Sequence, residues 1–345
     1  MKKSILVTGG AGFIGSNFVT HLYNKYPDYK LIVLDALTYA GDIENLPVNI
    51  SRDQDRRLSF WYGNVRNGEL VDTLVSQSDM VVHFAAETHV TRSIYDNFLF
   101  FETDVLGTQT IANAVLKYKD RIERFIHIST SEVYGTAHNK LMDEQHPLLP
   151  MSPYASAKAG ADRLVYSYWA TYKLPMVIAR PFNNYGPKQH LEKVIPRFIT
   201  GVMLDEKLRV HGDGMSKRDF VYVEDTCKAV DLMMHAPEEK VLGEVFNIGS
   251  NGDRSILSIA KDVNKEMDCR SDNIIFVGNR PGQVIRHTSD IGKIKKVLGW
   301  EPEVNWNEGL KKTIEWYKSN RALWKKQTWM KEIPIITASG KRELH

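Results

Sequence analysis

The chain has 345 residues, of which 43% are hydrophobic, so it can bury the core of one large domain or of two joined domains. Its 45 basic and 42 acidic residues give a net charge of +3, a balance that gives no basis for a nucleic-acid or membrane surface. The two cysteines, Cys227 and Cys269, lack the spacing of a metal site or redox motif, so we expect no metal and a reducing compartment.

The first ten residues, MKKSILVTGG, begin like a secretory signal, with charges followed by apolar residues. The apolar run is only about four residues long, whereas a signal peptide needs roughly 7 to 15. No stretch approaches the ~18 apolar residues of a membrane span. We therefore predict a first β-strand here and a cytoplasmic protein.

Apolar runs rich in β-branched residues alternate with helical patterns, which is typical of a parallel sheet covered by helices on both faces. The predicted strands are Ile5–Thr8, Leu31–Leu34, Met80–Ala85, Phe125–Ser129 and Pro175–Ala179, and the predicted helices are Gly12–Tyr26, Asp104–Tyr118 and Ala155–Tyr172. The sequence therefore predicts an α/β fold with a Rossmann-type, doubly wound parallel sheet over residues 1–180.

From about Arg180 onward the pattern loosens into turns rich in Pro and Gly. We predict a smaller, irregular α/β lobe over residues 181–325, with a possible return of the chain to the sheet at Val245–Ile248. Residues 326–345 form a C-terminal tail for which the sequence indicates no function.

A glycine-rich turn, with glycines at 9, 12 and 15, follows the first predicted strand and opens a helix. Without Cβ atoms the backbone can approach a pyrophosphate, which then lies at the positive helix N-terminus. Phe13 and Ile14 belong to the same turn. This pattern predicts a dinucleotide site.

Asp35 ends the second predicted strand, about 20 residues after the glycine turn, as the dinucleotide pattern requires. Its carboxylate can accept hydrogen bonds from both ribose hydroxyls and would repel a 2′-phosphate. The sequence therefore favours NAD over NADP. A glycine turn beside an unrelated surface aspartate is the weaker alternative, because several context requirements are met together.

Tyr154 and Lys158 are four residues apart, one above the other on a predicted helix face. A nearby cation favours the phenolate, which is the base that hydride chemistry on an alcohol needs. Lowering the pKa of a tyrosine from about 10 to near 7 requires roughly 4 kcal/mol, and we expect Lys158 and the cationic nicotinamide to supply it. The alternative is a solvent-exposed lysine without a catalytic role.

With these motifs the chain resembles the extended short-chain dehydrogenase/reductase family and, within it, the nucleotide-sugar 4,6-dehydratases, notably the dTDP-glucose type. The resemblance covers nearly the whole chain to about Tyr317. Its supporting stretches are Asp35–Gly41, His83–Ser93, Asn183–Pro187, Arg218–Asp225 and Arg280–Gly282. It implies a lyase that makes precursors of surface polysaccharides and holds NAD throughout its cycle.

The resemblance also implies the catalytic residues. Tyr154 takes the proton of the 4-hydroxyl of a hexose while C4 gives a hydride to NAD, and Thr130 lies beside it. Glu132 then removes the C5 proton, and loss of the 6-hydroxyl as water leaves an alkene between C5 and C6. Return of the hydride to C6 gives a 4-keto-6-deoxy sugar, whereas return to C4 gives a 5,6-ene, and the sequence leaves both products open.

Ser131 stands where the dTDP-glucose enzymes usually carry an aspartate that protonates the departing hydroxyl. A serine hydroxyl is a far weaker acid, so Glu132 would carry both proton roles, while Ser131 hydrogen-bonds and relays or merely caps a strand end. A similar Thr-Ser-Glu ending occurs in GDP-mannose and some UDP-N-acetylglucosamine dehydratases, and in UDP-glucuronate decarboxylases. A decarboxylase or a 4-epimerase therefore remains the alternative enzyme.

Other positions also depart from the family. Asp104 replaces a usual Asn, Asn64 replaces a usual Asp, and the family's RPGHDRRYAID reads here as residues 280–290, RPGQVIRHTSD. These departures leave the hexose and the nucleotide base open between dTDP and UDP and between glucose and N-acetylglucosamine.

The resemblance completes the set of expected ligand contacts. Asn64, Val65 and Ala85 are expected at the cofactor, and Glu87, His89 and Arg92 at the hexose. Arg218 and Arg286 would hold the diphosphate, since guanidinium forks suit phosphate oxygens. Weaker candidates for the nucleotide and phosphates are Asn183, Asn184 and Lys193.

Aromatic residues occur in two helical segments, Phe98–Tyr118 and Tyr154–Tyr172. In the family the corresponding helices pair across a two-fold axis, so we expect a homodimer. A catalytically silent NAD-binding sensor is the alternative of another class, but it would have no need of Thr130, Glu132, Tyr154 and Lys158.

Overall fold

The computed structural model describes residues 3–50, 57–269, 271–278, 282, 284–330, 334–336 and 342–344. The predicted tail, residues 326–345, therefore lies partly outside the described residues, as do Arg280 and Pro281 of the family motif.

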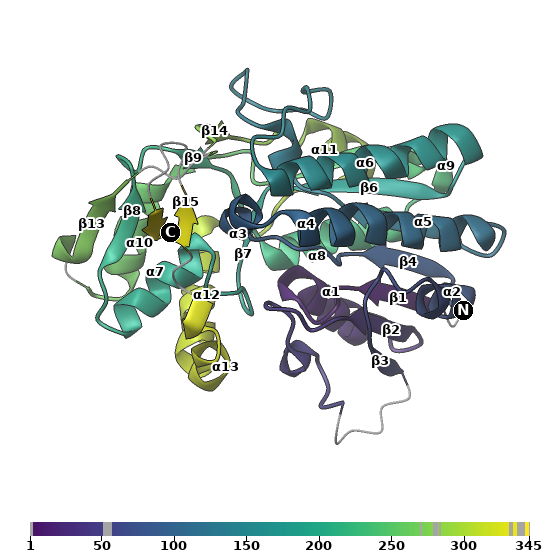
Figure 1. Ribbon diagram of the computed structural model, residues 1–345, viewed down its shortest axis with the longest axis horizontal. Coiled ribbons are helices and arrows are strands. Elements are labelled where there is room, and N and C mark those ends of the chain that lie inside the picture. The colour runs from purple at the N-terminus through teal and green to yellow at the C-terminus, as the bar shows by residue number, and fades with distance from the viewer. Residues whose placement is uncertain are drawn as a thin grey trace.

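A parallel sheet forms the centre of the larger lobe, with seven strands in the described part of the chain (Figure 1). The order across it is β11 (Val245–Ile248), β6 (Met176–Pro181), β5 (Arg124–Ile128), β4 (Met80–His83), β1 (Ser4–Thr8), β2 (Lys30–Asp35) and β3 (Leu58–Tyr62). Every pair in it is parallel. The order reverses between β1 and β4, and α/β sheets bind ligands at such a switch point.

Helices cover both faces of this sheet, and each face has its own apolar core. On one face lie α1 (Phe13–Lys25), α8 (Val223–His235) and α11 (Gly292–Leu298); on the other lie α2 (Gly68–Ser76), α5 (Thr108–Lys117) and α6 (Pro153–Tyr172). Strands buried on two faces must be apolar throughout, which is why the runs in the sequence do not alternate. The predicted Rossmann-type fold is confirmed.

The five predicted strands are all present, with ends shifted by one or two residues. The sequence missed β3, the edge strand, which carries the exposed aromatic side chains Trp61 and Tyr62. An edge strand buries less surface than a central one, so its residue pattern is mixed and its apolar signal is weak.

The predicted helix at Asp104–Tyr118 begins in a different form. The short helices α3 (Val90–Tyr95) and α4 (Phe98–Phe100) lead into a π-helical segment, η2 (Phe101–Gly107), before α5 starts. A π-helical turn is rare and often occurs at functional sites. Here it includes the fully buried Asp104.

The smaller lobe has its own core, formed mainly by aromatic and branched residues of its helices. Its helices are α7 (Val194–Met203), α10 (Ile256–Glu266), α12 (Trp306–Ser319) and α13 (Arg321–Lys325). Its short sheets pair β10 (Phe220–Tyr222) with β7 (Asn183–Tyr185), β13 (Ile274–Val277) with β8 (Leu208–His211), and β12 (Arg254–Ser255) and β14 (Arg286–His287) with β9 (Lys217–Arg218).

The remaining elements are short. They are α9 (Glu238–Val241), the 3-10 turns η1 (Ile43–Asn45), η3 (Ser131–Tyr134), η4 (Ser271–Asn273) and η5 (Thr328–Met330), and a tail hairpin of β15 (Pro334–Ile336) and β16 (Arg342–Leu344). In this hairpin β15 contacts α3. Among the described residues, no helix is long and apolar enough to cross a membrane, and no group of His, Cys, Asp or Glu side chains could hold a metal ion.

Candidate active site

A cavity of about 470 Å³ opens at the carboxyl edge of the sheet, and residues of both lobes line it. Loops that follow β1, β2, β4, β5 and β6 enter it from the larger lobe. From the smaller lobe come side chains of α7, β8 and β9, among them Arg197, Arg209 and Arg218. Its position matches the ligand site expected for a doubly wound sheet.

The glycine turn forms one wall of this cavity and depends on two close approaches. Gly9 has a φ of +67°, and a Cβ there would lie 2.5 Å from the backbone nitrogen of Ala85. A Cβ at Gly15 would lie 2.2 Å from the carbonyl oxygen of Gly9. Both positions therefore require glycine, and the turn leaves a backbone surface open at the start of α1.

Asp35 ends β2 and fixes the loops around the glycine turn. Its Oδ2 accepts the N–H of Ala11 at 2.9 Å and its Oδ1 accepts the N–H of Leu37 at 2.8 Å. Burial raises the pKa of Asp35, and these backbone donors partly offset that rise. The N–H of Gly12 also acts on this carboxylate, which has about four acceptor sites, so acceptor capacity remains for a ligand hydroxyl.

The start of α6 places Tyr154 and Lys158 on the cavity wall. The Ser152 hydroxyl caps the helix by accepting the N–H of Ala155, and the N–H of Tyr154 donates to Ser93 Oγ at 3.1 Å. One turn later, Lys158 Nζ donates to the carbonyl oxygen of Ile128 at 2.7 Å. Both side chains are buried and line the cavity.

The electrostatics of Tyr154 differ from the sequence-based expectation. Burial raises the pKa of Tyr154 well above its ordinary value, Asp104 and Glu132 raise it further, and a hydrogen bond with Thr130 lowers it. Among the residues of the chain, desolvation and two carboxyl groups therefore oppose ionisation of the phenol, so a fall in its pKa toward neutrality would depend on the charge of the bound nicotinamide. The residues of the chain therefore keep this phenol protonated.

Asp104 is a buried carboxyl group that acts electrostatically on both Tyr154 and Lys158. Its Oδ1 accepts the N–H of Glu87 at 2.8 Å, whereas its Oδ2 is buried without a hydrogen-bond partner in the described residues. Burial raises the pKa of Asp104 to about 7, and the charge of Lys158 opposes this rise. Through Asp104, the π-helical segment thus bonds to the loop after β4 and also interacts electrostatically with Lys158.

Thr130, Ser131 and Glu132 leave β5 in a 3-10 turn that aims alternate side chains at the cavity. The Thr130 Oγ1 accepts the N–H of Glu132 at 3.2 Å, and both side chains line the cavity. Ser131 is buried and is absent from the described lining residues. Its hydroxyl therefore does not contribute to the cavity wall as Thr130 and Glu132 do.

Glu87, His89 and Arg92 follow β4. Glu87 Oε2 lies 3.8 Å from Arg92 Nη1, and the Arg92 guanidinium stacks 4.7 Å from the centre of the Tyr39 ring. Burial lowers the pKa of His89 to about 4, so this imidazole is neutral at pH 7. Its Nδ1 accepts the N–H of Arg92, so its Nε2 carries the proton and faces Glu192 at 3.4 Å.

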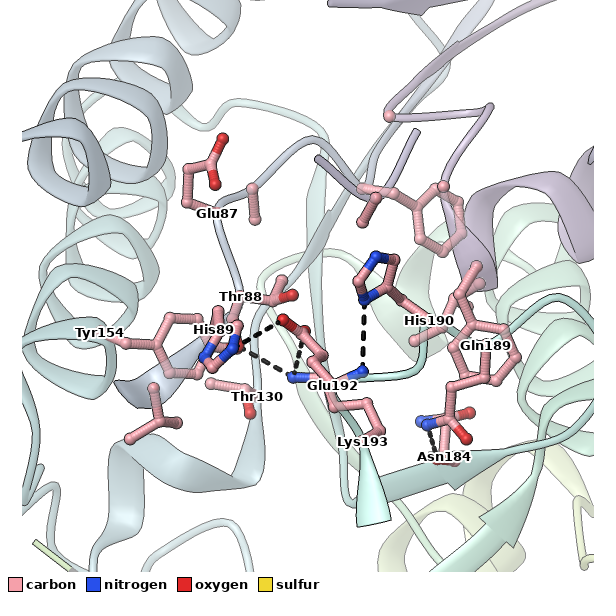
Figure 2. Close-up of a pocket in the computed structure, with 18 of the residues that line it drawn as sticks. Glu87, Thr88, His89, Thr130, Tyr154, Asn184, Gln189, His190, Glu192 and Lys193 are labelled. Carbon is pink, nitrogen blue, oxygen red and sulfur yellow. Dashed lines mark hydrogen bonds and ion pairs between the residues drawn. The ribbon is translucent and has the colours of Figure 1, made fainter. Parts of the chain in front are cut away.

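Glu192 is a central residue of this wall that the sequence analysis missed. Figure 2 shows it between His89 and Lys193, which come from different segments. It accepts the Tyr39 hydroxyl at 3.0 Å and pairs with Lys193 Nζ at 3.0 Å. Burial alone would raise its pKa, but Lys193, His89 and His190 outweigh burial and lower it.

Several buried polar atoms of the cavity wall lack a hydrogen-bond partner in the described residues: Asn184 Oδ1, Gln189 Oε1 and His190 Nε2. His190 Nδ1 accepts the N–H of Glu192, so its Nε2 carries a proton that points to no protein acceptor. Buried polar groups are normally paired, so these atoms indicate a bound polar ligand. Together with the glycine turn and Asp35, they fit a dinucleotide and a second polar molecule.

Most predicted site residues come together around this cavity. Those that line it are Gly9, Gly12, Phe13, Ile14, Gly15, Asp35, Asn64, Val65, Ala85, Glu87, His89, Thr130, Glu132, Tyr154, Lys158, Asn183, Asn184, Lys193 and Arg218. Ser131, Arg92 and Arg286 are not among its described lining residues. The guanidinium of Arg286 instead pairs with Asp253, with Nη2 at 2.8 Å from Oδ2.

Two lining residues have prior contacts of their own. Asn64 Oδ1 already accepts the N–H of Arg66 at 2.9 Å, and Lys193 Nζ donates to the carbonyl oxygen of Thr88 at 2.9 Å. The sequence did contain a clue to the missed residues, because His190 and Glu192 lie within three residues of Lys193. A predicted ligand-binding lysine makes polar neighbours in the same loop candidates as well.

Comparison with known proteins identifies the family. Residues 6–313 match the model of the family described as GDP-mannose 4,6 dehydratase. The chain belongs to this family. It is 45% identical over 313 residues to the low-salt glycan biosynthesis protein Agl12 of Haloferax volcanii, covering 91% of this chain and 98% of that protein. It is 40% identical to the dTDP-D-glucose 4,6-dehydratase of Mus musculus, covering 94% of this chain and 91% of that one.

Among solved structures, DesIV, a dTDP-glucose 4,6-dehydratase from Streptomyces venezuelae crystallised with NAD, is 39% identical. It superposes with a TM-score of 0.89, covering 94% of this chain and 100% of the other. The predicted membership of the nucleotide-sugar 4,6-dehydratases, the hydro-lyase class and the NAD cofactor are confirmed at the level of the family.

Proposed function

We propose that this chain is an NAD-dependent dehydratase that oxidises C4 of a nucleotide-linked, glucose-type hexose and eliminates water across C5 and C6. The observation that carries the proposal is that Thr130, Glu132 and Tyr154 line the same cavity as the dinucleotide turn. A base for an alcohol and a carboxylate for a neighbouring carbon acid are the two groups that such a reaction needs.

The cofactor would bind along the glycine turn, with its pyrophosphate at the start of α1 and its ribose at Asp35. Asn64 and Val65, which line the cavity, would lie at the adenine end of this path, and Ala85 lies against Gly9. When bound, NAD supplies the acceptor that takes the hydride from C4 and later returns it.

The chain itself would move the protons. Tyr154 takes the proton of the 4-hydroxyl, while Thr130, its hydrogen-bond partner, holds the phenol in place. The ketone formed at C4 acidifies the C5 proton, which Glu132 removes. Because Glu132 lines the cavity and Ser131 does not, Glu132 would also return a proton to the departing 6-hydroxyl.

The nucleotide and diphosphate would lie toward the smaller lobe, over residues 181–325. Arg218 is buried on β9 and lines the cavity, as do Asn183 and Asn184. We assign Arg286 no direct phosphate contact, since Asp253 already neutralises it. The related dTDP-glucose enzymes make dTDP- or UDP-glucose the first substrates to test.

The proposal is tested by incubating the NAD-loaded protein with dTDP-glucose, UDP-glucose and UDP-N-acetylglucosamine. Mass spectrometry should show loss of one water, and proton NMR should show either a methyl doublet or an exocyclic alkene. UDP-glucuronate and UDP-galactose serve as controls for the alternatives. Loss of carbon dioxide, inversion at C4, or no conversion with NAD still bound would each overturn the proposal.

We also propose that the protein is a cytoplasmic homodimer. Apolar side chains are exposed along the paired helical segments, namely Phe98, Phe101 and Leu106 on one and Tyr166 on the other. The segments α4 and η2, which carry the first three of these side chains, both contact α6, so the four side chains can form one face for a second copy (Figure 1). Light scattering of the parent and of Phe98→Asp would test this, and a monomeric parent would refute it.

A further inference from the structure

His287 on β14 is a completely buried histidine that lies behind the proposed catalytic carboxylate. Its Nε2 is hydrogen-bonded to the carbonyl oxygen of Gly135. A carbonyl oxygen can only accept, so Nε2 carries a proton. In a neutral imidazole the other nitrogen, Nδ1, is then a bare acceptor.

That acceptor faces Glu132. Nδ1 lies 3.7 Å from Glu132 Oε1 and has no hydrogen-bond partner in the described residues. The charged or titratable groups acting on the ring are Glu132, Arg218 on β9 and His146; burial, Arg218 and His146 lower the pKa of His287, whereas Glu132 raises it. With burial dominant, the imidazole stays neutral, so two acceptors face each other until a proton comes between them.

We propose that His287 is a positioning residue whose Nδ1 accepts a hydrogen bond from Glu132 whenever that carboxyl is protonated. This inference rests on the proposed dehydration. A hydrogen bond to the neutral form of a carboxyl favours its protonation, so His287 makes Glu132 a stronger base toward the C5 proton. His287 also holds the protonated Glu132 in place between the removal of the C5 proton and the protonation of the leaving hydroxyl.

The step balances without any further reactant. The C5–H bond breaks and its proton bonds to Glu132, while the electron pair forms the second C5–C6 bond. As the C6–O bond breaks, the proton passes from Glu132 to the leaving oxygen, giving water and the original carboxylate. His287 remains neutral throughout, and no second acid is needed at Ser131.

Two substitutions separate the nitrogens of the ring. His287→Gln places an amide near the position of Nε2, which keeps the Gly135 bond and removes the acceptor. His287→Asn places an amide near the position of Nδ1, which does the reverse. We expect His287→Gln to slow elimination roughly 10- to 100-fold, and His287→Asn to lose less. His235→Gln, on α8 and away from the cavity, is the matched control.

The readouts are single-turnover formation of reduced nicotinamide, which reports C4 oxidation, and release of water measured by product mass. The rate of C4 oxidation should be unchanged in His287→Gln, whereas the rate of elimination should fall. The pH below which elimination is lost should also be lower in this variant than in the parent. Oxidation without elimination in the parent would refute the proposed dehydration itself. Normal elimination in His287→Gln, or equal loss of both steps, would overturn the role of His287.

A measurement on the parent does not depend on either variant folding. With uniform ¹³C and ¹⁵N labelling, the His287 ring, assigned through its own backbone resonances, should show a bare Nδ1 and a protonated Nε2 at neutral pH. A doubly protonated ring, or a proton on Nδ1 alone, would overturn the proposal.

Discussion

Replacing Asp35 with asparagine should weaken NAD binding, although the two side chains have nearly the same shape. The two carboxylate oxygens accept backbone N–H groups from Ala11 at 2.9 Å and Leu37 at 2.8 Å, the N–H of Gly12 also acts on them, and the remaining acceptor capacity suits a ribose hydroxyl. An amide offers one acceptor oxygen, and its NH₂ group faces a backbone donor or a hydroxyl.

The magnitude follows from the bonds that are lost. A hydrogen bond to a charged group contributes about 1.5–3 kcal/mol, so loss of one ribose bond should raise the Kd for NAD about 10- to 150-fold. The charge of Asp35 also repels a 2′-phosphate, and Asp35→Asn removes this repulsion. The affinity for NADP should therefore fall less than the affinity for NAD, and the preference for NAD should decrease.

Calorimetric titration of cofactor-free protein measures both effects. Asp72→Asn is the matched control, because Asp72 pairs with Lys117 on the surface of α2, away from the cavity. An NAD affinity of Asp35→Asn within about twofold of the parent would refute the reasoning on hydrogen bonds. A weakened affinity with unchanged preference against NADP would refute the reasoning on charge.

Three further predictions concern protons and buried charges. Glu132→Gln should slow elimination by about 10²- to 10⁴-fold while C4 oxidation continues, and Ser131→Ala should eliminate at nearly the parent rate; equal losses in the two variants would contradict the assignment. Asp162→Asn should destabilise the protein by about 3–5 kcal/mol in urea at neutral pH, because the buried guanidinium of Arg180, bonded at 2.9 Å to each carboxylate oxygen, loses its negatively charged partner and keeps only neutral ones such as the Tyr134 hydroxyl. Burial raises the pKa of Asp162, but Arg180 outweighs burial and lowers it. The ion pair therefore stabilises the fold above the ordinary Asp pKa, and this stabilisation is lost as pH falls through the folded pKa. A stability difference between parent and Asp162→Asn that does not narrow in acid would contradict this. For Asp104 the sign is opposite: burial raises its pKa to about 7, so the parent should lose stability relative to Asp104→Asn as pH rises from about 4 through 7, and a difference independent of pH would count against this.

The parts of the site that the sequence predicts are those set by local spacing. The glycine turn, Asp35 and the Tyr154–Lys158 pair each depend on one turn, one strand end or one helical repeat. The parallel sheet then brings these segments to one edge, because every βαβ connection returns the chain in the same direction. Order along the chain thus determines proximity in space.

The parts that the sequence does not predict depend on contacts between distant segments. Glu192 is held by Tyr39, His89 and Lys193, and no local pattern marks that combination. The π-helical turn that buries Asp104 looks like ordinary helix in the sequence, since its residues suit either form. Ser131 and Arg286 were placed by analogy, and whether a side chain faces the cavity depends on the local turn and on Asp253.

The charge around Tyr154 suggests how the proposed oxidation would depend on the bound cofactor. The phenol is buried, Asp104 and Glu132 both oppose its ionisation, and Lys158 directs its ammonium to the carbonyl oxygen of Ile128. A protein that relied on its own residues to form the phenolate would not place two carboxyl groups beside it. In the proposed reaction the compensating positive charge would come from the nicotinamide, because the dinucleotide turn lines the same cavity. Tyr154 would then act as a base only with the oxidised cofactor bound, and after the hydride transfer the phenol would keep its proton. Under this proposal, the carboxyl groups that make Tyr154 a poor base in isolation would favour the ketone while Glu132 acts.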